Sequence, residues 1–177
     1  MIKVGINGFG RIGRLILRAL LENYKGKIQV VGINDLGSIE ANAHLIKFDS
    51  THGTLNLDIK TTGEGFQIGD QNIKVFAERD PEKLPWGKIG ADVVLECTGF
   101  FLDKNSAGKH IKAGAKKVII SAPAKEVDFT VVQGVNSKDL KKEHNIISNG
   151  SCTTNCLAPV AMVLENIFGI EYGYMTT

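Results

Sequence analysis

The sequence of 177 residues has little cysteine, little proline and no long apolar run, and each shortage argues against a class of protein. Its three cysteines cannot all pair with one another, so a secreted disulfide framework is not expected. The longest apolar runs, such as 118–120, are far too short to span a bilayer, and no apolar leader precedes the first predicted strand. The low proline content and the 20 glycines favour tight strand–helix junctions over a linker-rich chain.

An excess of charge of one sign is also lacking, because 21 Lys and Arg residues face 19 Asp and Glu residues. This balance gives no reason to expect nucleic acid or a membrane surface as a partner. A hydrophobic fraction of 43% with 23% charged residues is typical of an ordinary globular chain. We therefore expect a soluble, cytoplasmic protein with reduced thiols.

Strand and helix patterns alternate along the chain. Alternating apolar residues over 2–6 predict a strand, helical spacing predicts a helix over 11–24, and a second strand is expected over 28–33. This alternation predicts a doubly wound α/β fold with a mostly parallel sheet. Further strands are predicted at 55–60, 67–68, 73–76, 92–97, 117–120, 130–133, 146–148 and 170–177, a loop at 49–54, a short turn or helix at 80–87, and helices at 39–48, 104–113, 138–144 and 152–168.

A glycine-rich turn joins the first predicted strand to the first helix. Residues Gly8 to Gly13 match G-x-G-x-x-G, in which glycines allow close approach to a pyrophosphate and the helix N-terminus offers free N–H groups. Asp35, at the end of the next strand, has the spacing expected of a ribose-binding acid. A turn that only packs helix against sheet is the alternative, but the full context favours dinucleotide binding. The carboxylate of Asp35 and the uncharged Leu36 favour NAD over NADP.

Other residues are weaker candidates for the same site. Two predicted strands end at Thr98-Gly99 and Ser121-Ala122, and ligands bind beyond the carboxyl ends of strands in open parallel sheets. Simple turns are the plainer interpretation of both positions. Whether Arg11 and Arg14 contact a phosphate is left open.

A cysteine opens the last predicted helix. Ser151 is its expected N-cap, and the helix dipole and unpaired N–H groups stabilise the thiolate form of Cys152. The same N–H groups suit the oxyanion that forms when a thiolate attacks a carbonyl. Cys152 is therefore a candidate nucleophile, with an ordinary structural cysteine as the alternative. Cys156 and Cys97 are interpreted as buried side chains, and no metal site is expected because further ligands at suitable spacing are lacking.

The segment 151–159, SCTTNCLAP, resembles the active-site signature of the phosphorylating glyceraldehyde-3-phosphate dehydrogenases. The opening KVGINGFGRIGR over 3–14 is similar to the start of that family, as are 34–36, 78–81 and 96–99. The resemblance covers the whole chain. It implies a Rossmann-like NAD-binding domain over 1–149 and the start of a catalytic domain over 150–177.

The resemblance also implies a chemistry. Cys152 is implied to add to the aldehyde of glyceraldehyde 3-phosphate, after which hydride passes to NAD and inorganic phosphate cleaves the thioester to give 1,3-bisphosphoglycerate. Ser151 and Thr153 are implied to border substrate and phosphate. Within the NAD site, Asp35 is implied at the adenosine ribose and Arg79 near the adenine. The implied NAD-binding residues are Asn7, Gly8, Phe9, Gly10, Arg11, Ile12, Gly13, Asn34, Asp35, Arg79, and, near the nicotinamide half, Thr98, Gly99 and Ser121.

The resemblance departs at 175–177, which in the family lead directly to the histidine that activates the cysteine. We therefore expect this chain to be an incomplete part of a homotetrameric enzyme and to be inactive in isolation. Two alternatives stay open: an NAD-binding chain without efficient catalysis, and an erythrose-4-phosphate dehydrogenase, which has the same cysteine signature. The continuation Leu157-Ala158-Pro159 favours the glyceraldehyde enzyme.

Overall fold

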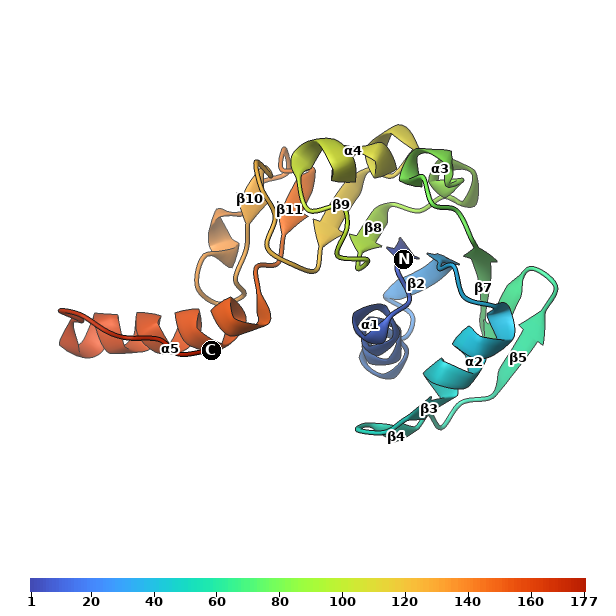
Figure 1. Cartoon of the computed structure of the whole chain (residues 1–177), viewed down its shortest axis with the longest axis horizontal. Coiled ribbons are helices and arrows are strands. Elements are labelled where there is room, and N and C mark those ends of the chain that lie inside the picture. Colours follow the sequence, from blue (N-terminus) through green and yellow to red (C-terminus); the bar gives the residue numbers. More distant parts are fainter.

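A computed structural model describes all 177 residues and contains one nine-stranded sheet (Figure 1). Seven neighbouring strands run parallel, in the order β10 (Phe129–Thr130), β11 (Ile146–Ser148), β9 (Lys117–Ile120), β8 (Val93–Glu96), β1 (Ile2–Asn7), β2 (Ile28–Asn34) and β7 (Gln71–Phe76). Two antiparallel strands, β6 (Gly65–Ile68) and β5 (Ile59–Thr62), complete one edge. The predicted mostly parallel α/β fold is confirmed, and all seven parallel strands end at the same edge of the sheet.

Helices join the parallel strands on opposite faces of the sheet (Figure 1). The chain leaves β1 toward β2 on one side, and leaves β8 toward β9 on the other. Right-handed crossovers then place the two sets of helices on opposite faces, with a switch point between the carboxyl ends of β1 and β8. The helices are α1 (Arg11–Asn23), α2 (Ile39–Lys47), α3 (Trp86–Ile89), α4 (Lys104–Lys112) and α5 (Cys152–Phe168), with short 3-10 turns at η1 (Pro81–Lys83) and η2 (Ser137–Asp139).

The largest group of buried apolar side chains lies against α1 and α2. It includes Ile6, Leu17, Ile33 and Ile46, all fully buried. Each such side chain contributes about 1.5–3 kcal/mol relative to an exposed one. Arg18 is also buried there, and its guanidinium donates to the carbonyl oxygens of residues 46, 47 and 53 at 2.8–3.1 Å. The charged side chain therefore closes the end of α2 onto the hairpin that follows it.

The predicted helix starts at Ser38 and Ser151 are confirmed. The Ser38 hydroxyl accepts from the Ala41 N–H at 3.1 Å, and the Ser151 hydroxyl from the Thr154 N–H at 2.9 Å. The last helix ends at Gly169, as expected, with a φ of 76° that favours glycine. These helix boundaries therefore coincide with the local signals in the sequence.

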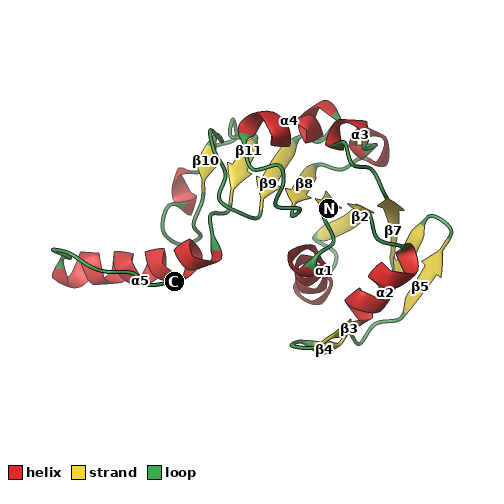
Figure 2. Ribbon diagram, viewed as in Figure 1, coloured by secondary structure: helices red, strands yellow, loops and turns green.

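Two elements predicted in the second half of the chain are wrong. Residues 170–177 form no strand, because no neighbouring strand is available to pair with their backbone (Figure 2). Residues 138–144 form no helix: only the 3-10 turn η2 is present, and Ser137 caps nothing. That segment contains three Lys, one Asp and one Glu and has one apolar residue, Leu140, so it has no apolar face to bury.

The segments between α2 and β8 also differ from prediction. The expected loop 49–54 contains a small hairpin of β3 (Phe48–Asp49) and β4 (Gly53–Thr54). The strand expected from residue 55 begins only at Ile59, and that expected over 130–133 is limited to β10. The turn predicted over 80–87 is divided into η1 and α3, which begins at Trp86. None of the helices combines the length and apolar composition needed to cross a membrane.

Candidate functional site

A cavity of about 520 Å³ opens at the switch point, beyond the carboxyl ends of β1, β2 and β8. Ligands of doubly wound sheets bind at this place. The cavity brings together residues that are far apart in the sequence. Its lining consists of Asn7, Gly8, Gly10, Asn34, Asp35, Leu36, Glu78, Arg79, Cys97, Thr98, Phe100 and Phe101.

The three glycines of the fingerprint have different surroundings. Gly8 has a φ of +90°, and a Cβ there would lie 2.7 Å from the backbone nitrogen of Thr98. A Cβ on Gly13 would lie 2.2 Å from the carbonyl oxygen of Gly8. By contrast, a Cβ on Gly10 would have no atom within 4 Å. Gly8 and Gly13 are thus required by packing, whereas Gly10 leaves open space at the start of α1, where a ligand can approach the backbone.

Asp35 joins the end of β2 to the glycine turn. Its Oδ2 accepts a hydrogen bond from the Phe9 N–H at 2.9 Å, and its Oδ1 accepts from the Gly37 N–H at 2.9 Å. The Asn34 side chain donates to Asn7 Oδ1 at 2.7 Å. Asn42 Nδ2 also donates to Asp35 Oδ1 at 3.4 Å. A carboxylate has about four acceptor positions, so Asp35 keeps capacity for a ribose hydroxyl.

Both arginines near the fingerprint are bound within the protein. Arg11 forms an ion pair with Asp49 at 2.9 Å, and the His52 and Thr51 N–H groups together with Arg11 hold the pKa of Asp49 well below its usual range. Arg14 Nη1 donates to the Phe9 carbonyl at 2.8 Å. The Arg11 side chain and the half-exposed Ile12 do not line the cavity. The N-terminus of α1 has no side-chain cap, so its free N–H groups can bind an anion here.

Of the three residues expected on the nicotinamide side of the site, one lies in the cavity lining. Thr98 lines the cavity, whereas Gly99 and Ser121 do not. The Ser121 N–H instead donates to the Glu96 carbonyl at 3.0 Å, and Cys97 forms part of the cavity wall. Burial raises the pKa of Cys97 to about 11. Phe100, which is 84% exposed, lies at this site and was missed by the sequence interpretation, although it directly follows the predicted strand end.

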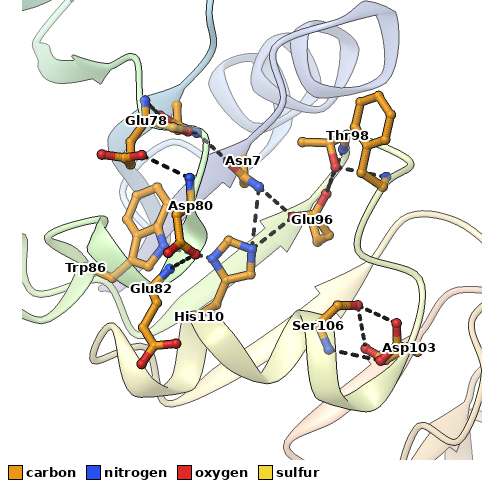
Figure 3. A network of polar contacts seen from close by, with 12 residues as sticks. Asn7, Glu78, Asp80, Glu82, Trp86, Glu96, Thr98, Asp103, Ser106 and His110 are labelled. Carbon is orange, nitrogen blue, oxygen red and sulfur yellow. Dashed lines mark hydrogen bonds and ion pairs between the residues drawn. The ribbon is translucent and has the colours of Figure 1, made fainter.

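A buried polar network lies behind the cavity and was also missed (Figure 3). Glu96 Oε2 accepts from Asn7 Nδ2 at 2.6 Å and lies 2.9 Å from His110 Nε2. Glu96 Oε1 accepts from the Thr98 N–H at 2.7 Å and from the Thr98 hydroxyl. Trp86 Nε1 donates to His110 Nδ1 at 2.9 Å. The only signal in the sequence is a glutamate at the end of an apolar strand.

Cys152 is the first residue of α5 and is exposed. The Ser151 hydroxyl lies 2.9 Å from that of Thr153, so the residues beside the thiol form one polar cluster. The Asn155 side chain donates to the carbonyls of Asn149 and Ser151 at 2.7 and 2.9 Å, which fixes the turn between β11 and α5. The cysteine is therefore held at a helix N-terminus on the same edge of the sheet as the cavity.

Cys156 is exposed, so its interpretation as a buried side chain is wrong. The helix α5 projects away from the sheet (Figure 1). Apolar side chains are exposed along its length. The exposed apolar side chains of α5 include Leu157, Val160, Leu164 and Ile167. No group of three or more His, Cys, Asp or Glu side chains is arranged to hold a metal ion.

Comparison with known families gives two matches along the chain. Residues 2–104 match the family described as glyceraldehyde 3-phosphate dehydrogenase, NAD binding domain. Residues 151–177 match the family described as glyceraldehyde 3-phosphate dehydrogenase, C-terminal domain. The two matches cover the cavity-forming strands β1, β2 and β8 and the helix that carries Cys152.

Curated relatives agree with these matches. The chain is 54% identical over 176 residues to a glyceraldehyde-3-phosphate dehydrogenase of Xanthobacter flavus, covering 99% of this chain and 52% of the relative. It is 56% identical over 177 residues to that of Clostridium pasteurianum, covering 100% of this chain and 52% of the relative. It is 55% identical over 177 residues to the glyceraldehyde-3-phosphate dehydrogenase of Geobacillus stearothermophilus, covering 99% of this chain and 52% of the relative. The chain thus spans about half the length of the curated relatives it matches.

Proposed function

The chain belongs to the glyceraldehyde-3-phosphate dehydrogenase family, and we propose that it supplies the NAD site and the nucleophile of a phosphorylating dehydrogenase. The proposed reaction converts glyceraldehyde 3-phosphate, NAD and inorganic phosphate into 1,3-bisphosphoglycerate and NADH. One observation carries this proposal: the exposed Cys152 at the start of α5 and the cavity at the switch point lie on the same edge of one parallel sheet.

The residues around the cavity fit a dinucleotide. The uncapped N-terminus of α1 and the open space at Gly10 suit the pyrophosphate. Asp35 is proposed to accept from the adenosine ribose, with Arg79 near the adenine. Thr98, Gly99 and Ser121 are proposed to lie toward the nicotinamide. Arg11 and Ile12 contribute through their backbone N–H groups, because the Arg11 guanidinium is paired with Asp49.

The proposed chemistry begins at Cys152. Its thiolate sulfur bonds to the aldehyde carbon, and the carbonyl oxygen becomes an oxyanion that the N–H groups at the start of α5 stabilise. A bound NAD would supply the acceptor for the hydride that leaves that carbon. The Cys152 sulfur then holds the acyl group as a thioester, which inorganic phosphate attacks, so that acyl phosphate leaves and the thiolate returns. Ser151 and Thr153 are proposed to border the substrate and the incoming phosphate.

The complete protein is proposed to be a cytoplasmic homotetramer in which 1–149 form the NAD-binding domain and 150–177 begin the catalytic domain. His110 is not available as the base for Cys152, since both of its ring nitrogens are bound to Glu96 and Trp86 in the interior. We therefore expect a polypeptide of these 177 residues alone to turn over little or no glyceraldehyde 3-phosphate.

The test is NADH formation by the complete natural protein and by two cysteine variants. Cys152→Ser should abolish turnover and keep NAD affinity, whereas Cys156→Ser, the matched exposed thiol one turn later, should keep both. Full turnover by Cys152→Ser would overturn the proposed nucleophile. A higher kcat/KM for erythrose 4-phosphate would assign the alternative substrate, and NAD binding without turnover of either aldehyde would leave a binding function only.

A further inference from the structure

Glu96 is a fully buried carboxylate with donors on both oxygens. Asn7 and His110 donate to Oε2, and the amide and hydroxyl of Thr98 donate to Oε1. A buried charge is tolerated only when it is fully hydrogen-bonded. The four donors meet this requirement, so both carboxylate oxygens of Glu96 are held by fixed partners.

The indole of Trp86 fixes the protonation of His110. An indole N–H is a donor only, so His110 Nδ1, 2.9 Å away, must be an unprotonated acceptor. The proton of the neutral imidazole therefore lies on Nε2, which faces Glu96. Trp86 thus selects the one neutral tautomer that donates to the carboxylate.

The other members of the network belong to the cavity. Asn7 and Thr98 both line it, one from the end of β1 and one from the end of β8. The Thr98 hydroxyl also accepts from the Phe100 N–H at 3.1 Å, so the turn 97–100 is closed around the same side chain. Asn7 in turn accepts from Asn34 at 2.7 Å. Movement of Glu96 would therefore shift the cavity wall on both sides of the switch point.

We propose that Glu96 is a positioning residue for the cofactor, which holds Asn7 and the Thr98 turn in their binding geometry, and that Trp86 and His110 keep it in place. This inference rests on the proposed function, because it assumes that NAD occupies the cavity. Glu96 does not line the cavity itself and acts only through the residues that do. The role adds three residues, Trp86, Glu96 and His110, that the sequence did not single out.

The first test is NAD affinity of the complete natural protein and of Glu96→Gln, measured by calorimetry below the unfolding temperature of both. Glutamine has nearly the same shape but turns one acceptor into a donor that faces other donors. NAD affinity should fall about tenfold or more, because the new amide donor and the donor opposite it are then buried without an acceptor. Glu64→Gln is the control, because Glu64 is exposed and pairs only with Lys74 at 3.7 Å; it should not change NAD affinity.

A pair of His110 variants separates positioning from stability. Glutamine can place its side-chain NH₂ where Nε2–H of His110 lies, whereas leucine cannot donate at all. His110→Gln should keep NAD affinity within about threefold of wild type, and His110→Leu should lose about tenfold or more. A purely structural role would lower the melting temperature of both variants without separating their NAD affinities. The ¹⁵N shifts of His110 at neutral pH should report the Nε2–H tautomer in wild type, and Trp86→Phe should remove that preference.

The outcomes are distinct. If wild type does not bind NAD, the proposed function fails. If wild type binds NAD and both Glu96→Gln and His110→Leu bind it equally well, the positioning role of Glu96 is overturned while the proposed function stands. Should Glu96→Gln fail to fold, the His110 pair and the tautomer measurement still decide the question, because a Nδ1–H tautomer in wild type contradicts the network.

Discussion

The backbone N–H of Phe9 donates to the carboxylate of Asp35 at 2.9 Å, so the middle of the glycine fingerprint and the acid at the end of the next strand form one unit. The second oxygen of Asp35 is bound by the Gly37 N–H at the same distance. The carboxylate thus shapes the turn and, as one of the two carboxylates that line the cavity, places a negative charge where a ribose is proposed. A substitution at Asp35 should therefore change both cofactor affinity and cofactor choice.

Cofactor preference should depend on Asp35. In Asp35→Ser the charge and two hydrogen bonds to N–H groups are lost, which should weaken NAD binding about tenfold. The affinity for NADP should fall less than that for NAD, or should rise, since the 2′-phosphate is no longer repelled by the carboxylate. Calorimetry with both cofactors on the complete protein measures the ratio. Asp70→Ser is the control, because Asp70 is exposed and pairs with Lys25 at 3.6 Å; an unchanged NAD to NADP ratio in Asp35→Ser would contradict the assignment.

The second and third glycines of the fingerprint should separate effects on folding from effects on binding. Gly13→Ala places a methyl group 2.2 Å from the Gly8 carbonyl and should lower the free energy of unfolding by about 2 kcal/mol or more. Gly10→Ala has space around its methyl group and an ordinary φ of −67°, so its stability cost should be about 1 kcal/mol or less.

That methyl group at residue 10 nevertheless occupies the space through which a pyrophosphate approaches the backbone. NAD affinity of Gly10→Ala should therefore fall by at least tenfold while the protein stays folded. Urea unfolding gives the stability of each variant, and calorimetry gives the affinity. Equal NAD affinity of Gly10→Ala and wild type would show that the dinucleotide does not lie against this turn.

Much of the fold and the site was predictable because the informative signals are local. The strand, glycine turn and helix over 2–23 follow from the pattern of a single segment, and so do the caps at Ser38 and Ser151. Segments that depend on distant partners were not predictable. An alternating pattern over 170–177 predicts a strand only if another strand lies beside it, and Cys156 would be buried only if something covered α5.

The network around Glu96 shows the same limit at the site. Asn7 and Glu96 are 89 residues apart in the sequence, and His110 comes from a helix on another segment. Each of these residues has an ordinary interpretation when taken alone, as a turn asparagine, a strand-end glutamate or a helix histidine. Their role depends on the register of β1 beside β8, in which Asn7 is opposite Glu96, and only the paired strands show this.

Acid stability should depend on the ion pair between Lys104 and Asp128. The Lys104 ammonium at 2.6 Å, followed by the Ile146 N–H, lowers the pKa of Asp128 from 3.8 to about 2. A carboxyl with a lowered folded-state pKa stabilises the fold above its unfolded pKa, and this contribution is lost as the pH falls toward 2. Lys104→Met should thus lower the free energy of unfolding by at most about 1 kcal/mol at pH 7, and should not change it once Asp128 is protonated.

Urea unfolding of wild type and Lys104→Met across this acid range measures the difference. Lys112→Met is the matched control on the same helix, since Lys112 is well exposed and lies 3.6 Å from Glu82. Lys112→Met should lower the free energy of unfolding at neutral pH by less than Lys104→Met does. A cost of Lys104→Met that persists unchanged to pH 2 would mean that lost packing of the lysine stem, and not its charge, is responsible.

The three cysteines should differ sharply in their reactivity toward iodoacetamide. Cys152 and Cys156 are exposed, whereas Cys97 lies in the cavity wall with a pKa of about 11. Only a thiolate reacts, so at pH 8 about one Cys97 in a thousand is in the reactive form, before its burial is counted. Mass spectrometry should find label on Cys152 and Cys156 of the folded protein, and on Cys97 only after denaturation. Rapid labelling of Cys97 in the folded protein would show that the end of β8 opens, and the cavity beyond β1, β2 and β8 would then be one of several states of this edge.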